Sequence, residues 1–594
     1  GGHNVAVGYE ALSLEDAHGG NTAVGAQALR VLNAGADGFN TAIGFVAGEA
    51  MTTGIENTIV GALAGDAVTT GARNSFFGKD AGSSLTTGLN NTAIGKSALR
   101  SSVDGDSNTA IGYAALEDYE DGDGNGHNTA VGAKSQLNAS TGEFNTSLGS
   151  DSMGVGVVTG DKNVAVGYRS GKTLTSGAGN VVMGAFAGQA LTTGADNVAV
   201  GFEALLTEDT HGNNTALGFR ALKTLNANAD GLNTAVGSSA GLAMTTGIAN
   251  TVIGALAGDA ITTGVSNVFV GTDAGGGLTT GESNVAVGKD ALLSSVDGDH
   301  NTAIGFKALE DYEDGNANGH NTAVGSKSQL NASTGEFNTS LGSLSMGAGV
   351  ATGDGNVALG YKAGIDITSG ASNILIGYQA GDTISTGNNN IAIGTFALDS
   401  EDGGGHNIAI GRHALGTLDA GANAKSVAIG YEAGLAMTTG VRNTIIGGLA
   451  GDAMTTTSDN VAIGYEALTS ATIGDGNVAV GNHALYTNVA ADRNIAIGYQ
   501  ALYLATAAST VDSYNTAIGF QAADHITSGV QNTILGGLAG NAINTGDNNI
   551  IIGYNAAASA AGVDNTTVIG TTATTSALVH GLKQPVIAAS ANVA

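Results

Sequence analysis

The stretch NTAIG at residues 40–44 decides the fold, because nearly all of the chain repeats it. The same pentad pattern returns at Asn57 and Asn74, at a constant spacing of 17. Following the pattern from Asn4 to Thr566 gives 33 copies, and every copy has glycine in its fifth place. A repeat this regular indicates one small structural unit stacked many times, so we expect the chain to form a solenoid.

Composition excludes several classes of protein. Charged residues make up only 12% of the chain, which is too apolar to be disordered. A single proline and the absence of a Gly-X-Y period exclude collagen. The net charge of −31 without a basic cluster argues against nucleic acid as a partner. With no cysteine there is no thiol nucleophile, and no apolar run approaches the ~20 residues that would predict membrane insertion.

Positions in the repeat are counted from the pentad asparagine, which is position 0. In a strand, positions 1 and 3 share one face, and positions 0, 2 and 4 share the other. The first face is apolar and β-branched, so we expect it to point into the coil. The second face is small and uncharged, so we expect it to pack against another chain. The residues that represent this structural repeat are Asn40, Ala42, Ile43, Gly44, Asn57, Gly61, Asn74 and Gly78.

The rest of each coil completes the expected fold. Position 7 is mostly alanine or serine and position 11 is often apolar, which predicts a second inward row. Thr-Thr-Gly then closes many coils, and its glycine permits a tight turn. We therefore predict an all-β parallel solenoid of about 33 coils, most of them at the spacing of 17, with two short strands and two turns per coil. The stacked asparagines are expected to bond to one another and to neighbouring backbone.

Longer coils reveal a larger repeat. Most intervals between pentads equal the interval from Asn40 to Asn57, and the few longer ones recur in the same order 11 coils later, first from Asn21 and again from Asn214. We predict three tandem super-repeats, at 1–196, 197–389 and 390–570, the last of them diverged. Residues 571–594 lack the pattern and are expected to form an irregular cap or connector.

The additional residues of the long coils all lie just before the next pentad, so they are expected to share one edge of the solenoid. They are acidic and polar, and such an edge is where solenoids often bind partners. Solvated loops without a partner are the simpler interpretation. The candidate surface-binding residues are Glu117, Asp118, Tyr119, Glu310, Asp311 and Tyr312.

One of these inserts resembles half of a calcium loop. Asp121, Asp123 and Asn125 have the D-x-D-x-N-G spacing, but Gly132 stands where a bidentate acid is required. Calcium is therefore possible there, although a Gly/Asp turn explains the same residues. No other cofactor is expected. The histidines lack the spacing of a zinc site, and no nucleophile motif stands in a strand-to-helix context, so we expect no enzymatic activity.

The pentad followed by Ala-Gly or Ala-Leu resembles the head repeats of YadA-like trimeric autotransporter adhesins, and still more the N-T-A-I-G repeats of bacteriophage tail fibres. The resemblance covers about residues 4–570. It implies a left-handed parallel β-roll, a parallel homotrimer whose small-residue faces meet at the axis, and attachment to a host or another surface.

These observations lead to three hypotheses of function. The first is a structural and adhesive fibre, extracellular or on a virion surface, whose partners are copies of itself and a host glycan or protein. The second is a self-assembling extracellular filament or sheath. The third is an ice- or crystal-binding solenoid. Such a role needs rows of threonine on one face, whereas the threonines at positions 12 and 13 are adjacent, and adjacent residues of a strand point to opposite faces.

Overall fold

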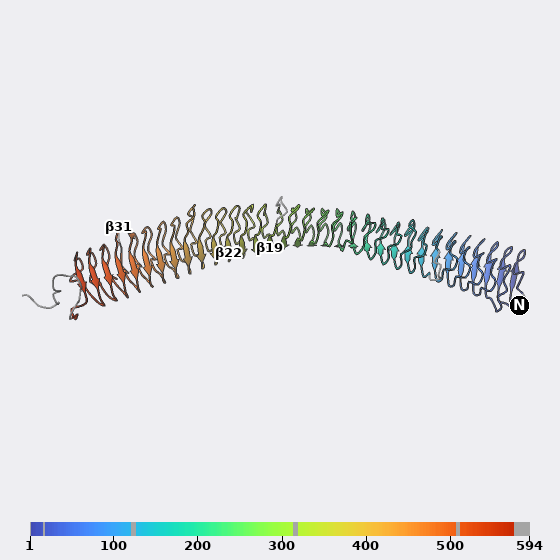
Figure 1. Ribbon diagram of the computed structural model, residues 1–594, viewed down its shortest axis with the longest axis horizontal. Coiled ribbons are helices and arrows are strands. Elements are labelled where there is room, and N and C mark those ends of the chain that lie inside the picture. The colour runs from blue at the N-terminus through green and yellow to red at the C-terminus, as the bar shows by residue number, and fades with distance from the viewer. Residues whose placement is uncertain (1, 16–17, 120–125, 313–318, 507–510, 575–594) are drawn as a thin grey trace, which may run out of the picture. The chain divides into compact units, whose positions relative to one another are not determined.

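The computed structural model describes residues 2–15, 18–119, 126–312, 319–506 and 511–574. It divides the chain into two compact units, Gly1–His300 and Asn301–Ala594. In the described residues of both units the secondary structure is strand and turn, without helix. Figure 1 shows the coils of each unit stacked in chain order. The protein is therefore an all-β parallel solenoid, as the repeat predicts. The three super-repeats are a different division of the chain and stay a prediction.

Each pentad forms one short strand. In the first unit the described strands are β1 (Val5–Val7), β2 (Thr22–Val24), β3 (Thr41–Ile43), β4 (Thr58–Val60), β5 (Ser75–Phe77), β6 (Thr92–Ile94), β7 (Thr109–Ile111), β8 (Thr129–Val131), β9 (Thr146–Leu148), β10 (Val164–Val166), β11 (Val181–Met183), β12 (Val198–Val200), β13 (Thr215–Leu217), β14 (Thr234–Val236), β15 (Thr251–Ile253), β16 (Val268–Val270) and β17 (Val285–Val287).

The second unit continues the same pattern and adds one small second sheet. Its described strands are β18 (Thr302–Ile304), β19 (Thr322–Val324), β20 (Thr339–Leu341), β21 (Val357–Leu359), β22 (Ile374–Ile376), β23 (Ile391–Ile393), β24 (Ile408–Ile410), β25 (Val427–Ile429), β26 (Thr444–Ile446), β27 (Val461–Ile463), β28 (Val478–Val480), β29 (Ala491–Asp492), β30 (Ile495–Ile497), β31 (Val511–Asp512), β32 (Thr516–Ile518), β33 (Thr533–Leu535), β34 (Ile550–Ile552) and β35 (Thr567–Ile569). Strands β29 and β31 pair with each other.

The pentad strands pair in parallel and in register. Strand β3 lies beside β4, with Thr41 opposite Thr58 and Ala42 opposite Ile59. The same register holds across a longer interval, where Thr109 of β7 lies opposite Thr129 of β8. The expectation of two strands per coil is wrong for most of the described residues. Among the described residues outside the pentads, strand pairing is limited to β29 with β31 and to two isolated bridges, and the others lie in turns and irregular segments.

The core of each coil is built from positions 2, 7, 8 and 11. In the coil that begins at Asn40, Ala42, Ala47 and Met51 are fully buried, which confirms the inward rows at positions 7 and 11. Larger side chains are matched by smaller neighbours. Phe76 replaces alanine at position 2, and a Cβ on Gly82 would lie only 2.8 Å from the ring of Phe76.

Glycine at position 4 is required for two reasons. Gly44 has φ +146°, which L side chains rarely adopt. A Cβ there would also collide with the carbonyl oxygen of Gly61 in the next coil, and Gly61 meets Gly78 in the same way. The close approach of successive coils therefore explains why every pentad has glycine in this place.

The asparagine ladder is present as predicted. The backbone N–H of Asn57 donates to Asn40 Oδ1 at 2.9 Å, and Asn57 Nδ2 donates to the same oxygen at 3.2 Å and to the Gly71 carbonyl at 2.9 Å. Asn74 repeats these contacts one coil further on. These buried amides hold one corner of the coil, and a structural role accounts for them.

Candidate interaction surfaces

The two faces of the pentad strand are the reverse of those expected. Asn40 and Ala42 are buried inside the coil, whereas Ile43 is 40% exposed and Thr41 is half-buried. A short coil encloses little space, so alanine fits its inward strand position and the asparagine side chain finds its backbone partners there. The apolar, β-branched face is therefore the outer one. The proposed packing of the small-residue face against another chain is wrong.

This outer face carries an apolar side chain at position 3 of every pentad strand, beside Thr, Val, Ser or Ile at position 1. It is formed by position 3 together with position 1, and we call it the strand face. Large apolar side chains of the strand face that are more than a third exposed include Val7, Ile43, Phe77, Ile94, Leu148, Met183, Leu217 and Ile253 in the first unit and Ile304, Leu341, Ile429, Ile497, Leu535 and Ile550 in the second.

Aromatic rings line the corner that follows the strand. At position 5, Tyr168 and Phe202 lie on either side of Phe186 from position 6, with ring centroids 5.4 and 5.9 Å apart. Tyr361 and Tyr378 stack at 5.4 Å in the second unit. Arginine or lysine lies over several of these rings, such as Arg220 over Phe219 at 4.8 Å.

The predicted insert residues separate into exposed and buried groups. Asp118 and Asp311 are exposed, while Glu117 and Glu310 are half-buried. Glu117 pairs with Arg100 at 2.8 Å, and Glu310 pairs with Lys307 at 2.7 Å. These four acidic residues therefore lie on the outside of the coil, as a surface-binding role requires.

Tyr119 and Tyr312 are fully buried, so their assignment to a binding surface is wrong. Both tyrosines stand at position 11, which points into the coil. The ring of Tyr119 lies 2.9 Å from the place where a Cβ of Gly105 would be. They are core residues.

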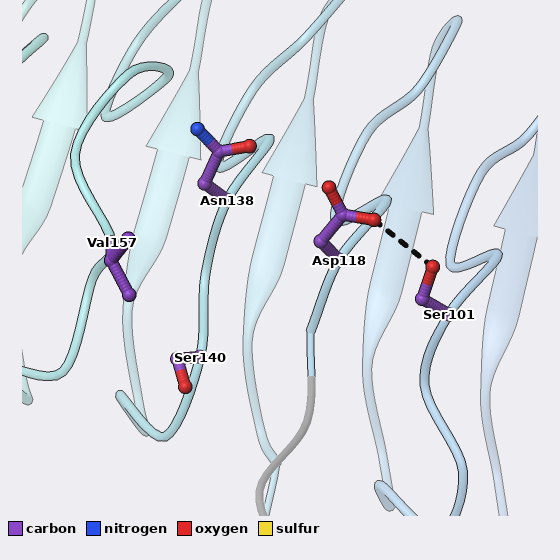
Figure 2. A pocket seen from close by; sticks show the side chains of 5 residues that line it. All are labelled: Ser101, Asp118, Asn138, Ser140 and Val157. Atoms are coloured by element: carbon purple, nitrogen blue, oxygen red, sulfur yellow. Dashed lines mark hydrogen bonds between the residues drawn. The ribbon is translucent and has the colours of Figure 1, made fainter.

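Asp118 lines a shallow pocket of about 440 Å³ on this edge. Figure 2 shows it with Ser101, Asn138, Ser140 and Val157, and Ser101 Oγ donates to Asp118 Oδ1 at 3.0 Å. The lining offers hydroxyl, amide and carboxylate groups for hydrogen bonding. The same five residue types recur one super-repeat later, at Ser294, Asp311, Asn331, Ser333 and Val350.

The calcium candidates Asp121, Asp123 and Asn125 lie outside the described residues, so calcium there stays a prediction. Within the part of the chain that the structure describes, no group of three or more His, Asp or Glu residues is placed to bind a metal. That part also contains no helix long and apolar enough to cross a membrane.

Buried glutamates are a feature that the sequence analysis did not identify. Glu208 and Glu401 are fully buried at position 11. Glu208 accepts the backbone N–H of His211 at 3.0 Å and that of Ala227 at 3.1 Å. A long coil follows each of these glutamates, and a backbone N–H of that coil donates to the buried carboxylate, from Ala227 to Glu208 and from Ala420 to Glu401. An acid at an inward position just before a long coil is the signal that could have identified them.

Stacked carboxylates on the turn side of the second unit change one another's titration. Burial raises the pKa of Asp399 to about 6, and the Asp382 carboxylate on the preceding coil adds to that rise. Burial also raises the pKa of Asp382, with repulsion from Asp366 contributing.

Comparison with known proteins adds no assignment. No protein-family model matches the chain, and no curated protein matches it either. The proposals below therefore depend on the surfaces just described.

Proposed function

We propose that the chain is a non-enzymatic structural protein that assembles with copies of itself into a fibre for attachment, extracellular or on a virion surface. A β-solenoid is compatible with such a role, because each further coil extends the stack without a new fold. The observation that carries the proposal is the strand face. Its apolar side chains are exposed in an isolated chain, and a second copy supplies a matching surface.

The size of the strand face supports a stable self-contact. A three-residue strand is roughly 10 Å wide and successive strands lie about 4.8 Å apart, so each coil offers roughly 50 Å² of flat surface. The pentad strands of the first unit, β1 to β17, then provide roughly 800 Å², which is the area that each partner buries in a standard protein interface. Half of this surface, the row at position 3, carries an apolar side chain in every coil, and a continuous exposed row of this kind is typical of an interaction site.

A closed assembly of three parallel copies fits the chain best. Three strand faces around one axis bury the β-branched side chains and leave no apolar face open to further association. The charge of −31 per chain then faces water on the outer sides. The resemblance to trimeric adhesin heads and tail-fibre repeats also favours an assembly of three chains.

An ice-binding role has less support. The threonine hydroxyls at position 12 donate to backbone carbonyls of the next coil, as Thr69 does to Thr86 at 3.1 Å and Thr86 does to Val103 at 2.9 Å. Hydroxyls used in this way are less available to a crystal surface.

Electron microscopy of the purified chain tests the proposal. We expect slender particles of one discrete length. Filaments of indefinite length would support the alternative of a self-assembling filament or sheath, and compact particles would contradict both.

A further inference from the structure

The coils that begin at Asn460, Asn477, Asn494 and Asn515 carry a group of aromatic side chains around His483. We call it the tyrosine cluster, and it consists of Tyr465, Tyr486, Tyr499, Tyr503 and Phe520. Its members come from positions 5 and 9, in the turn segment that follows each strand. They do not belong to positions 1 and 3, which form the strand face.

Ring contacts connect the cluster into one surface. Tyr486 and Tyr503 are stacked with centroids 5.1 Å apart and planes 8° from parallel. Tyr499 stacks on Phe520 at 5.3 Å. Edge contacts at 5.2 to 6.3 Å join the ring of His483 to Tyr465, Tyr486, Tyr499 and Tyr503.

The cluster is held in place and remains open to solvent. His483 Nε2 lies 2.9 Å from Glu466 Oε2, which fixes the imidazole between the tyrosines. Tyr465, Tyr499 and Phe520 are 48%, 41% and 53% exposed. Four successive coils at about 4.8 Å spacing extend the aromatic surface over roughly 14 Å.

The surroundings of the cluster select the chemistry of a ligand. Residues 460–531 contain five acidic residues and one arginine, so an anionic ligand would be repelled. The Tyr486 hydroxyl is a hydrogen-bond donor at neutral pH, as an ordinary tyrosine is, and the Glu466 carboxylate raises its pKa further. The imidazole of His483 fills the space between the tyrosines, so a compact cation has no cage to enter.

Gln500 and Gln521 directly follow Tyr499 and Phe520, and Gln521 Nε2 donates to Gln500 Oε1 at 2.8 Å. A flat aromatic area beside tyrosine hydroxyls and these amides fits a ligand with both apolar faces and hydroxyl edges.

We propose that the tyrosine cluster binds a neutral oligosaccharide. The C–H faces of the sugar rings would pack on Tyr465, Tyr499 and Phe520, and hydroxyl groups would meet polar neighbours such as Gln500. This inference supplies a ligand class for the attachment role proposed above and rests on that role.

The other two super-repeats lack the cluster. One super-repeat earlier, the residues that correspond to His483, Tyr486 and Tyr503 are Asp290, Leu293 and Glu310. Two super-repeats earlier, they are Ser97, Arg100 and Glu117. Phe306 stands in the place of Tyr499 and is 42% exposed, so it offers a matched control on a coil without the cluster.

Saturation-transfer NMR with cellohexaose, maltohexaose and chitohexaose tests the proposal on the full chain. We expect transfer to the ring protons of at least one of the three sugars. The variants Tyr465→Ala and Tyr499→Ala should each weaken that binding about tenfold, whereas Phe306→Ala should leave it unchanged. Circular dichroism and native mass of all three variants should match those of the parent chain.

Three results would overturn the assignment: no transfer to any of the three sugars, equal weakening by Phe306→Ala, or binding of choline or heparin at the cluster in place of a neutral sugar. Failure here is separate from failure of the fibre proposal, because the native mass reports assembly at the strand face and the sugars report only the cluster.

Discussion

At the residue scale, the asparagine at position 0 is the side chain on which most of the coil depends. Its side-chain oxygen accepts the backbone N–H of the asparagine in the next coil. Its amide nitrogen donates to the asparagine oxygen of the preceding coil and to a backbone carbonyl, all within a buried corner. Ser426 replaces one of these asparagines and keeps only part of the pattern. Its Oγ accepts the Asn443 N–H at 3.2 Å, but serine lacks the amide that reaches the carbonyl at position 14.

This difference predicts opposite effects for two exchanges. Asn57→Ser should destabilise its coil by about 1–3 kcal/mol, because the Gly71 carbonyl loses a buried donor. Ser426→Asn should stabilise its own coil by about 1 kcal/mol, because an amide restores the ladder. Hydrogen exchange of the two coils measures both effects. Faster exchange in Ser426→Asn would show that the ladder is not the stabilising feature.

The raised pKa of Asp399 predicts a pH-dependent gain from its removal. A carboxyl group with a pKa of about 6 in the folded chain and a lower one when unfolded favours folding in its protonated form. Its contribution is present at low pH and is lost as pH rises through about 6. Asp399→Asn should therefore stabilise the second unit by about 1 kcal/mol at pH 8, after allowance for solvent screening.

That gain should shrink below pH 6, where Asp399 is protonated in the folded chain. Thermal melts from pH 5 to pH 8 measure the trend, with the exposed Asp196→Asn as control. A stabilisation that is independent of pH would contradict the electrostatic cause.

At the scale of elements, the repeat length and the inward rows at positions 7 and 11 were predictable, because the strict spacing of the sequence shows both directly. The orientation of the strand was not, because apolar residues on one strand face fit either a core or an interface between chains. Coil volume decides between them, and only the packed structure shows that alanine fills the inside. Tyr119 was predictable in principle, since it occupies position 11, but its place in an acidic insert suggested a surface.

The buried glutamates are expected to hold the junctions with the long coils that follow them. Glu208→Gln should speed hydrogen exchange at His211 and Ala227 about tenfold, because an amide offers only one acceptor to two donors. Glu203→Gln on the same coil removes an outer carboxylate paired with Arg220 and is the control. Equal exchange in both variants would contradict a junction role.

Substitutions at two neighbouring residues of one strand should affect folding in one case and assembly in the other. Ala42→Glu places a charge inside the coil and should unfold the local coils, since Ala42 is fully buried. Ile43→Asp places its charge on the strand face and should leave circular dichroism unchanged while it weakens self-association. If both variants behaved alike in circular dichroism and size exclusion, the inner and outer faces would be wrongly assigned.

At the scale of the whole molecule, the chain combines one repeated coil with few places that depart from it. The strand face recurs in every coil and suits self-assembly, whereas the tyrosine cluster occurs in only one super-repeat and suits recognition. Sequence periodicity predicts that a feature of the first kind recurs in every coil, although it does not show which face of the strand lies outside. The second depends on which side chains neighbouring coils bring together, as the stacked rings of Tyr486 and Tyr503 show.

Native mass measurement tests the central claim most directly. A homotrimer predicts a single species of three times the chain mass of 57.9 kDa, and Ile43→Asp combined with Ile94→Asp should shift it toward the single chain. A parent chain that is stable at one or two chain masses would contradict the account.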